Sequence, residues 1–138
     1  MIRQLSIFAE NRRGAMSRIT QILYDAGINM NTLITNDSAE FGIIRMLVSD
    51  TDKAADVLQN AGYMCHTDAV AAVEIGDECG SLNRLLSVIS DGNINLDYLY
   101  VTYNTLSRLP VAILRTSDLP EVESFLQGRG YNTLKRID

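Results

Sequence analysis

The residues best suited to bind a small charged molecule lie in two polar loops that end in glycine. Asn11-Arg12-Arg13-Gly14 and Asp77-Glu78-Cys79-Gly80 each come directly before a stretch with helical periodicity. The N-terminus of a helix carries unpaired N–H groups and about half a positive charge, which favours a carboxylate there. Because glycine has no Cβ, such a ligand can approach the backbone closely. Glycine-containing loops between a strand and a helix are also common where nothing binds, so the loops alone leave both interpretations open.

A second pair of candidates is Asn29 and Asn95, each following a helix-ending turn where the next strand is expected. Asparagine is depleted in strands, so its presence at both positions needs a local reason. A side-chain amide offers a donor and an acceptor to a small zwitterion. A local side-chain turn kept at both positions accounts for the same residues without a ligand, and both explanations stay open.

The cysteines and the single histidine offer weaker chemistry. Cys65 and His66 are adjacent, and adjacent strand residues point to opposite faces, so a metal site that also used Cys79 is disfavoured. Cys79 comes just before an expected helix, where a thiol pKa is lowered, but no histidine is near it in the sequence. We therefore expect no metal, no cofactor, no catalytic residue and two reduced cysteines.

These candidates occur in pairs because the sequence contains an internal repeat. The matched positions are Gly14 and Gly80, Arg18 and Arg84, Asn29 and Asn95, Asp50 and Asp118, and Gly62-Tyr63 and Gly130-Tyr131. A short insertion falls between Asn95 and Asp118. Solenoid repeats need at least about three copies to close a core. We therefore predict two small domains of one kind, residues 1–67 and 68–138.

Both copies contain the same expected order of elements, β-α-β-β-α-β. Alternating or continuous apolar residues predict strands at residues 3–8, 28–34, 43–48 and 63–65 of the first copy and 70–75, 94–103 and 110–114 of the second. One-sided apolar periodicity predicts helices between Gly14 and Gly27, between Asp50 and Gly62, between Gly80 and Gly92, and after Asp118. Among the strand residues, Tyr98 and Tyr100 are expected to share one face.

No linker separates the copies, because residues 63–75 are almost continuously strand-like. The last strand of the first unit therefore runs into the first strand of the second, and we expect the units to lie side by side. A split β-α-β unit with two helices on one sheet face is the ferredoxin-like plan. The predicted fold class is α+β, with two ferredoxin-like units. That plan supports many functions, so the fold alone decides little.

Composition narrows the range of partners. The 138 residues carry a net charge of −5, which disfavours nucleic acid and anionic membrane surfaces. Residues 43–48 also lack the aromatic side chains that an RNA-binding module of this topology uses. No apolar run approaches the roughly 20 residues of a membrane span, and no signal-peptide core is present, so we expect a cytoplasmic protein. Domains this small bury only about 60% of their unfolded surface, which favours a homodimer.

The segment from Phe8 to Met30, FAENRRGAMSRITQILYDAGINM, resembles the ACT domain, a small regulatory module attached to many enzymes of amino-acid metabolism. ACT sequences typically show a strand, a polar loop ending in Asn-x-Pro-Gly or similar, an amphipathic helix and then Gly-Ile/Val-Asn-Ile. Here Arg13 stands where many members have proline. The resemblance covers essentially the whole chain twice and implies a tandem ACT protein.

The resemblance also implies where an amino-acid effector binds, since in ACT domains it often sits where two domains meet. The implied positions are Asn11, Arg13, Gly14, Ala15, Met16, Asn29 and Met30 in the first copy and Asp77, Gly80, Ser81, Leu82, Asn95 and Leu96 in the second. The second loop departs from the family pattern, because Asp77-Glu78-Cys79 replaces the usual residues. We therefore expect two unequal sites.

The resemblance favours a non-catalytic amino-acid sensor that modulates a separate partner enzyme of amino-acid metabolism. One alternative is a small ferredoxin-like enzyme acting on an acyl or phosphoryl group, with Arg12-Arg13-Gly14 holding an anion and Asn29 positioning water. That alternative lacks an obvious nucleophile or base. A further alternative is a ligand-free assembly module, which needs no pocket.

Overall fold

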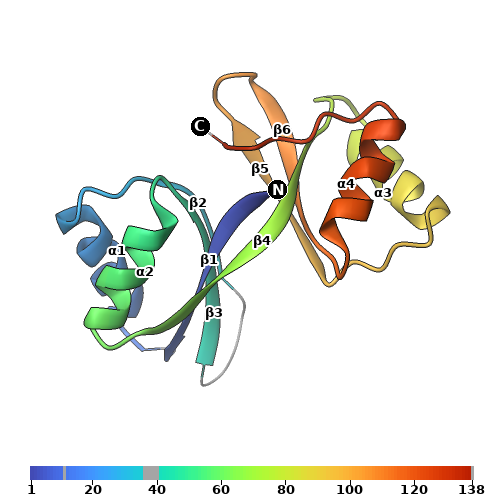
Figure 1. Ribbon diagram of the computed structural model, residues 1–138. Coiled ribbons are helices and arrows are strands. Elements are labelled where there is room, and N and C mark those ends of the chain that lie inside the picture. Colours follow the sequence, from blue (N-terminus) through green and yellow to red (C-terminus); the bar gives the residue numbers. More distant parts are fainter. Residues whose placement is uncertain (11, 36–40, 138) are drawn as a thin grey trace. The chain divides into compact units, whose positions relative to one another are not determined.

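The computed structural model describes residues 1–10, 12–35 and 41–137 and divides into two compact units (Figure 1). The N-terminal unit is Arg3–Asp68, and the C-terminal unit is Met1–Ile2 together with Ala69–Asp138. The loop residue Asn11 lies outside the described residues, and so does Asn36-Asp37-Ser38, where the polar sequence predicts a turn. In the part of the chain that is described, no helix has the length and apolar character needed to cross a membrane.

The N-terminal unit has the predicted β-α-β-β-α-β order. Its elements are β1 (Ile2–Glu10), α1 (Ala15–Asp25), β2 (Met30–Thr35), β3 (Phe41–Val48), α2 (Thr51–Asn60) and the first part of β4 (Met64–Glu74). The strand order is β2-β3-β1-β4, and β3 pairs antiparallel with both β1 and β2. This is the strand order of a ferredoxin-like sheet.

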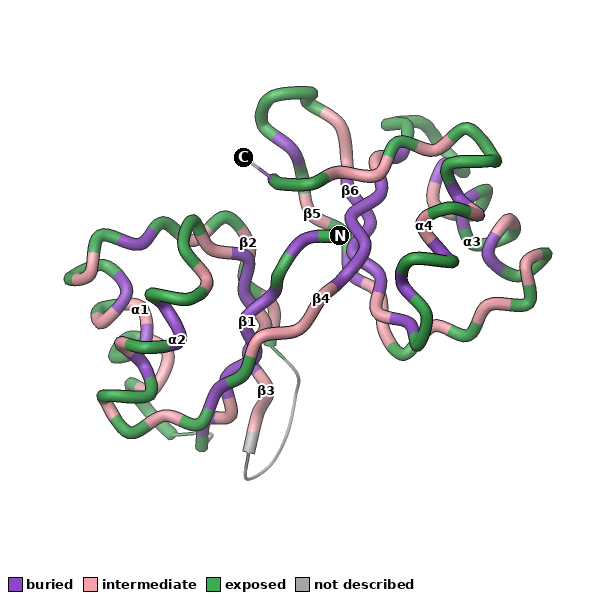
Figure 2. The backbone as a smooth tube through the Cα atoms, in the orientation of Figure 1, coloured by how far each residue is buried: buried purple, intermediate pink, exposed green. Residues whose placement is uncertain are grey.

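Two helices cover one face of this sheet and form a single core with it. Ile19 and Leu23 of α1 and Leu58 of α2 are fully buried against Leu5 and Ile7 of β1. Figure 2 shows the same pattern, with buried stretches along the strands and on the inner sides of the helices. The helical face predicted from the sequence is confirmed, because burying such an apolar stripe is what holds a short helix on its sheet.

The C-terminal unit repeats the plan. Its elements are the rest of β4, α3 (Ser81–Asp91), β5 (Tyr98–Asn104), β6 (Leu109–Arg115) and α4 (Leu119–Gly128), with strand order β4-β6-β5. The place of a last strand is taken by a short segment that bonds to β4. The Glu74 N–H donates to the Asn132 carbonyl (3.0 Å), and the Leu134 N–H donates to the Ala72 carbonyl (2.8 Å). The predicted α+β class with two ferredoxin-like units is confirmed.

The C-terminal core differs from the N-terminal one at the end of its first helix. Gly92 stands where the N-terminal unit has Ala26, and Phe125 stands where it has Val57. A Cβ on Gly92 would lie 2.7 Å from Cζ of Phe125, closer than packed atoms approach. The larger ring on α4 therefore requires the smaller residue after α3, since a close-packed core tolerates little added volume.

Strand β4 is continuous over 11 residues, as predicted from residues 63–75. Cys65 packs in the core of the N-terminal unit, whereas Ala71 and Val73 pack in the core of the C-terminal unit. One strand therefore serves both units.

The predicted starts of the second strand in each unit were wrong. β2 begins at Met30 rather than Ile28, and β5 begins at Tyr98 rather than Ile94. The Ile28 N–H donates to the Leu23 carbonyl (3.0 Å), and the Ile94 N–H donates to the Ile89 carbonyl (3.2 Å). These bonds close the end of the preceding helix, so the two isoleucines belong to a helix cap rather than to a ladder.

Helices α2 and α4 begin with an aspartate cap. Asp50 accepts a hydrogen bond from the Lys53 N–H (3.1 Å), and Asp118 accepts one from the Glu121 N–H (3.3 Å). Each carboxylate satisfies an N–H group that has no partner within its helix.

We expect Asp50→Ala and Asp118→Ala each to lower the free energy of unfolding by about 1 kcal/mol, because each removes a cap. Chemical denaturation of the full chain measures this. Asp56→Ala is the matched control on α2, since Asp56 is exposed and outside the first turn, and it should change stability by less than about 0.5 kcal/mol. Equal effects of Asp50→Ala and Asp56→Ala would contradict the capping role.

Candidate functional site

Helices α1 and α3 begin differently from α2 and α4. Each is preceded by a left-handed glycine, Gly14 (φ 83°) and Gly80 (φ 89°), and neither N-terminus has a side-chain cap hydrogen bond. Only glycine adopts this conformation without strain. The first-turn N–H groups of α1 and α3 therefore lack the carboxylate that Asp50 and Asp118 supply elsewhere. A ligand carboxylate could take that place.

The two loops share a backbone geometry but differ in charge. The Ala15 N–H donates to the Arg12 carbonyl, and the Ser81 N–H donates to the Glu78 carbonyl, both at 3.2 Å. Arg12 and Arg13 are exposed in the first loop, whereas Asp77, Glu78 and Cys79 are exposed in the second. The repeat has thus kept one loop shape and reversed the sign of its side chains.

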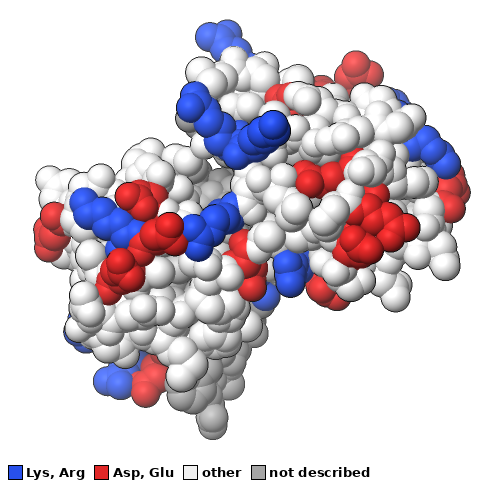
Figure 3. Space-filling model, viewed as in Figure 1, with Lys and Arg blue, Asp and Glu red and all other residues white. Residues whose placement is uncertain are grey.

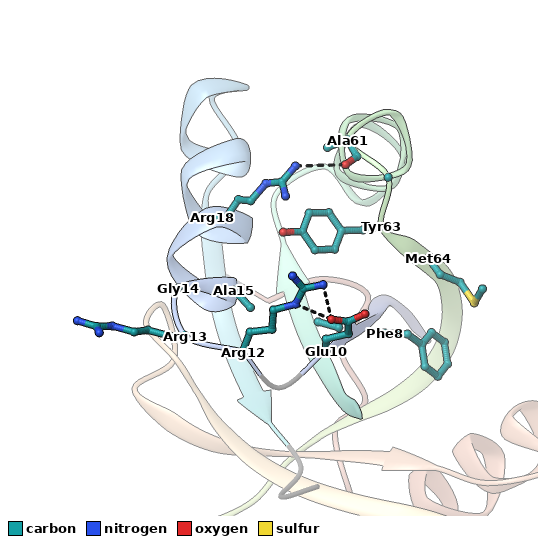
Figure 4. Close-up of a pocket in the computed structure, with 12 residues that line it drawn as sticks. Phe8, Glu10, Arg12, Arg13, Gly14, Ala15, Arg18, Ala61, Tyr63 and Met64 are labelled. Carbon is teal, nitrogen blue, oxygen red and sulfur yellow. Dashed lines mark hydrogen bonds and ion pairs between the residues drawn. The ribbon is translucent and has the colours of Figure 1, made fainter. Parts of the chain in front are cut away.

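A hollow of about 620 Å³ lies in the N-terminal unit beside the first loop (Figure 4). It is bounded by the end of β1, the start of α1 and the connection from α2 to β4. Its lining residues are Phe8, Ala9, Glu10, Arg12, Arg13, Gly14, Ala15, Arg18, Ala61, Gly62, Tyr63 and Met64. This volume falls within the roughly 300–1,000 Å³ that is typical of small-molecule sites.

Charged side chains concentrate on one side of the hollow. Arg12 bonds to one oxygen of Glu10 through both Nε and Nη2. The Arg18 guanidinium lies 5.4 Å from the centre of the Tyr63 ring, and its Nη2 donates to the Ala61 carbonyl (3.5 Å). In Figure 4 the side chain of Arg13 points away from the others.

Of the sequence-predicted positions, Arg13, Gly14 and Ala15 line the hollow, but most of its other lining residues were not predicted. Glu10, Arg18, Tyr63 and Met64 come from four different elements or connections, so no local motif joins them. A signal was present in the repeat, because Arg18 matches Arg84 and Tyr63 matches Tyr131.

Asn29 is held by local hydrogen bonds. Its N–H donates to Ser49 Oγ (3.0 Å), its carbonyl accepts from the Ser49 N–H (2.9 Å), and its side-chain Nδ2 donates to Asn31 Oδ1 (3.0 Å). These bonds tie the start of β2 to the end of β3. Asn95 is exposed and precedes β5. Neither residue is among those lining the hollow.

The other predicted positions divide between core and surface. Met16 and Met30 pack against the N-terminal core, and Leu82 and Leu96 pack against the C-terminal core. Ser81 is buried, and its Oγ accepts a hydrogen bond from the Glu78 N–H (3.4 Å). Asp77 and Gly80 are exposed.

The two cysteines lie in different environments. Cys65 is buried and Cys79 is exposed, and neither forms a disulfide. Burial raises the pKa of the Cys65 thiol, whose Sγ donates to the Ala55 carbonyl (3.7 Å). Among the described residues, no group of three or more His, Cys, Asp or Glu side chains could hold a metal ion.

On the face in Figure 3, acidic and basic side chains occur together on each unit.

Comparison with known proteins identifies the family. A family model described as an ACT domain pair matches residues 1–125. The chain belongs to the ACT domain pair family. A comparison with curated proteins gave no match.

Solved structures share this ACT-pair fold. Protein BT0572 from Bacteroides thetaiotaomicron is 28% identical, with a TM-score of 0.88, covering 96% of this chain and 91% of that one. The regulatory subunit of aspartate kinase from Thermus thermophilus, in a ligand-free form, is 12% identical, with a TM-score of 0.67, covering 91% and 88%. The corresponding subunit from Thermus flavus is also 12% identical, with a TM-score of 0.60, covering 81% and 80%. At this identity, the likeness to the kinase subunits concerns the fold.

We expect a thiol reagent such as 5,5′-dithiobis(2-nitrobenzoate) to modify Cys79 quickly and Cys65 only after unfolding. The physical reason is that Cys79 is exposed, whereas Cys65 is buried with a raised pKa. Absorbance at native and denaturing conditions measures this, and Cys79→Ser should abolish the fast phase. Fast labelling in Cys79→Ser would contradict the burial of Cys65.

Proposed function

We propose that this ACT-pair protein is a non-catalytic regulator that binds a free amino acid and modulates a separate partner in amino-acid metabolism. The observation that carries the proposal is the uncapped N-terminus of α1, with its left-handed Gly14, opening beside a ligand-sized hollow. The α-carboxylate common to all amino acids suits such a helix N-terminus.

The corresponding positions of the C-terminal unit form a second, unequal site in this proposal. Gly80 supplies the same backbone conformation before α3, but Asp77 and Glu78 place negative charge next to it. Like charges disfavour a carboxylate there, so the N-terminal unit is the stronger site. Asn29 and Asn95 do not line the hollow and remain proposed ligand positions, each offering a side-chain amide as donor and acceptor.

The side chains around the hollow support binding rather than catalysis. The described lining residues provide charge and apolar surface but include no serine, cysteine or histidine. Serine and cysteine are the usual nucleophiles and histidine is the most frequent general base, and the carboxylate of the lining residue Glu10 is engaged by Arg12.

Regulation follows from linkage between two binding events. If the amino acid binds one conformation of the ACT pair more tightly, it shifts the population that a partner recognises. Solved proteins with this fold include subunits named as regulatory subunits of aspartate kinase, which is consistent with action on another chain. The proposal includes a cytoplasmic homodimer, since small units gain stability by burying surface together.

We expect at least one of the twenty amino acids to raise the thermal unfolding midpoint of the full chain. A ligand present at about 100 times its Kd adds about 2.7 kcal/mol to folding, which corresponds to a shift of about 5 °C or more for a chain of this size. A thermal-shift screen measures it.

The control in this screen is the decarboxylated amine of each stabilising amino acid. It should give little or no shift, because it lacks the group that binds the helix N-terminus. No shift with any amino acid, or an equal shift with the amine, would sink the proposal.

A further inference from the structure

Glu10 and Arg12 present an open acceptor and an open donor side by side in the hollow. The Arg12 N–H donates a hydrogen bond to the Glu10 carbonyl (2.8 Å), so the two residues lie close together. Arg12 uses Nε and Nη2 on one oxygen, Oε2, of Glu10. Glu10 Oε1 and Arg12 Nη1 take no part in these two contacts. This pair can bind the ammonium and the carboxylate of a zwitterion without first separating.

Arg18 adds a second positive charge to the same side. Its guanidinium stacks over Tyr63 and makes one long bond, to the Ala61 carbonyl at 3.5 Å. No described carboxylate forms an ion pair with it. In Figure 4, Tyr63 lies between Arg18 and the Glu10–Arg12 pair. A carboxylate near the start of α1 would therefore have Arg12 and Arg18 within the same hollow.

The hollow also has an apolar lining. Phe8, Tyr63 and Met64 supply its larger side chains, and small residues keep it wide. Met64 is 72% exposed, although it lies at the start of a strand that is otherwise part of the sheet. An exposed thioether beside aromatic rings is well suited to cover an apolar ligand.

The C-terminal unit lacks the charged pair and some of the apolar residues that line the hollow of the N-terminal unit. Gly76 and Glu78 occupy the positions of Glu10 and Arg12, so the acceptor and donor pair is absent. Glu74 and Asn132 occupy the positions of Phe8 and Met64, and Asn132 Nδ2 donates to Glu74 Oε1. Arg18 and Tyr63 are kept in the second copy as Arg84 and Tyr131, so the lining residues that distinguish the N-terminal unit are Phe8, Glu10, Arg12 and Met64.

We infer that the hollow of the N-terminal unit binds a free amino acid with a large apolar side chain. Glu10 takes the α-ammonium group and Arg12 takes the α-carboxylate, while Arg18 adds positive charge to the hollow from beyond Tyr63. The side chain packs on Phe8, Tyr63 and Met64. This inference rests on the proposed function and assigns to it a ligand class and a site contained within one unit.

Isothermal titration calorimetry of the full chain tests the ligand class, with L-phenylalanine, L-leucine and L-methionine as probes. At least one should bind at least about tenfold more tightly than glycine, because glycine leaves the apolar wall uncovered. 3-Phenylpropionate lacks the ammonium group and phenethylamine lacks the carboxylate. Both should bind at least about tenfold more weakly than L-phenylalanine.

Variants with matched controls from the other unit test the site. Glu10→Gln and Arg12→Gln should each weaken binding of the best probe by at least about tenfold. Glu78→Gln and Arg84→Gln, at the corresponding loop and helix of the C-terminal unit, should leave it within about twofold. Met64→Asn should weaken binding roughly fivefold or more, whereas Leu106→Asn, also at an exposed apolar residue, should not. Circular dichroism checks that each variant is folded.

The outcomes separate the inference from the proposed function. If no amino acid binds, both are overturned. If an amino acid binds but Glu78→Gln or Arg84→Gln weakens it while Glu10→Gln does not, the function stands and this site is wrong. A preference for glycine or for a charged amino acid overturns the ligand class. Tight binding of an apolar amino acid that depends on Glu10, Arg12 and Met64 supports the whole inference.

Discussion

One strand constrains the architecture, because β4 belongs to both units. Its start follows Tyr63 and supplies Met64 to the hollow of the N-terminal unit, and its end leads through Glu74 into the loop before α3. Cys65 lies in one core and Ala71 in the other, so the strand must satisfy two sets of packing contacts. A change of register in β4 would move every side chain to the opposite face and disrupt both cores.

Comparison of the two copies distinguishes residues that the backbone conformation requires from residues proposed to contact a ligand. Both units keep a left-handed glycine before the first helix and an aspartate cap on the second. The side chains around the first loop do not follow this rule, since Arg12 becomes Glu78 in the second copy. The two hydrophobic cores also differ, because Gly92 and Phe125 of the C-terminal unit stand where the N-terminal unit has Ala26 and Val57. The two units are therefore one fold carrying two different surfaces.

The fold could be predicted almost completely from the sequence. Hydrophobic periodicity is a local signal for each helix and strand, and the repeat shows that both units follow the same order of elements. The errors fell at Ile28 and Ile94, where helix-closing hydrogen bonds override an alternation that reads as strand. The hollow could not be predicted in the same way. Glu10, Arg18 and Tyr63 are brought together by tertiary packing, and no spacing along the chain encodes their proximity. Only Arg12, Arg13, Gly14 and Ala15, in the loop and at the start of α1, could be predicted from a motif.

The central claim is that the N-terminal unit by itself recognises the amino acid. Hydrogen–deuterium exchange of the full chain, with and without a saturating amount of the tightest-binding of L-phenylalanine, L-leucine and L-methionine, tests it most directly. We expect slower exchange in peptides covering residues 12–18 and 61–64, because the ligand covers the start of α1 and the turn before β4. Peptides covering residues 78–84 and 129–132, the corresponding parts of the C-terminal unit, should be unchanged. Protection confined to the second set would contradict the account.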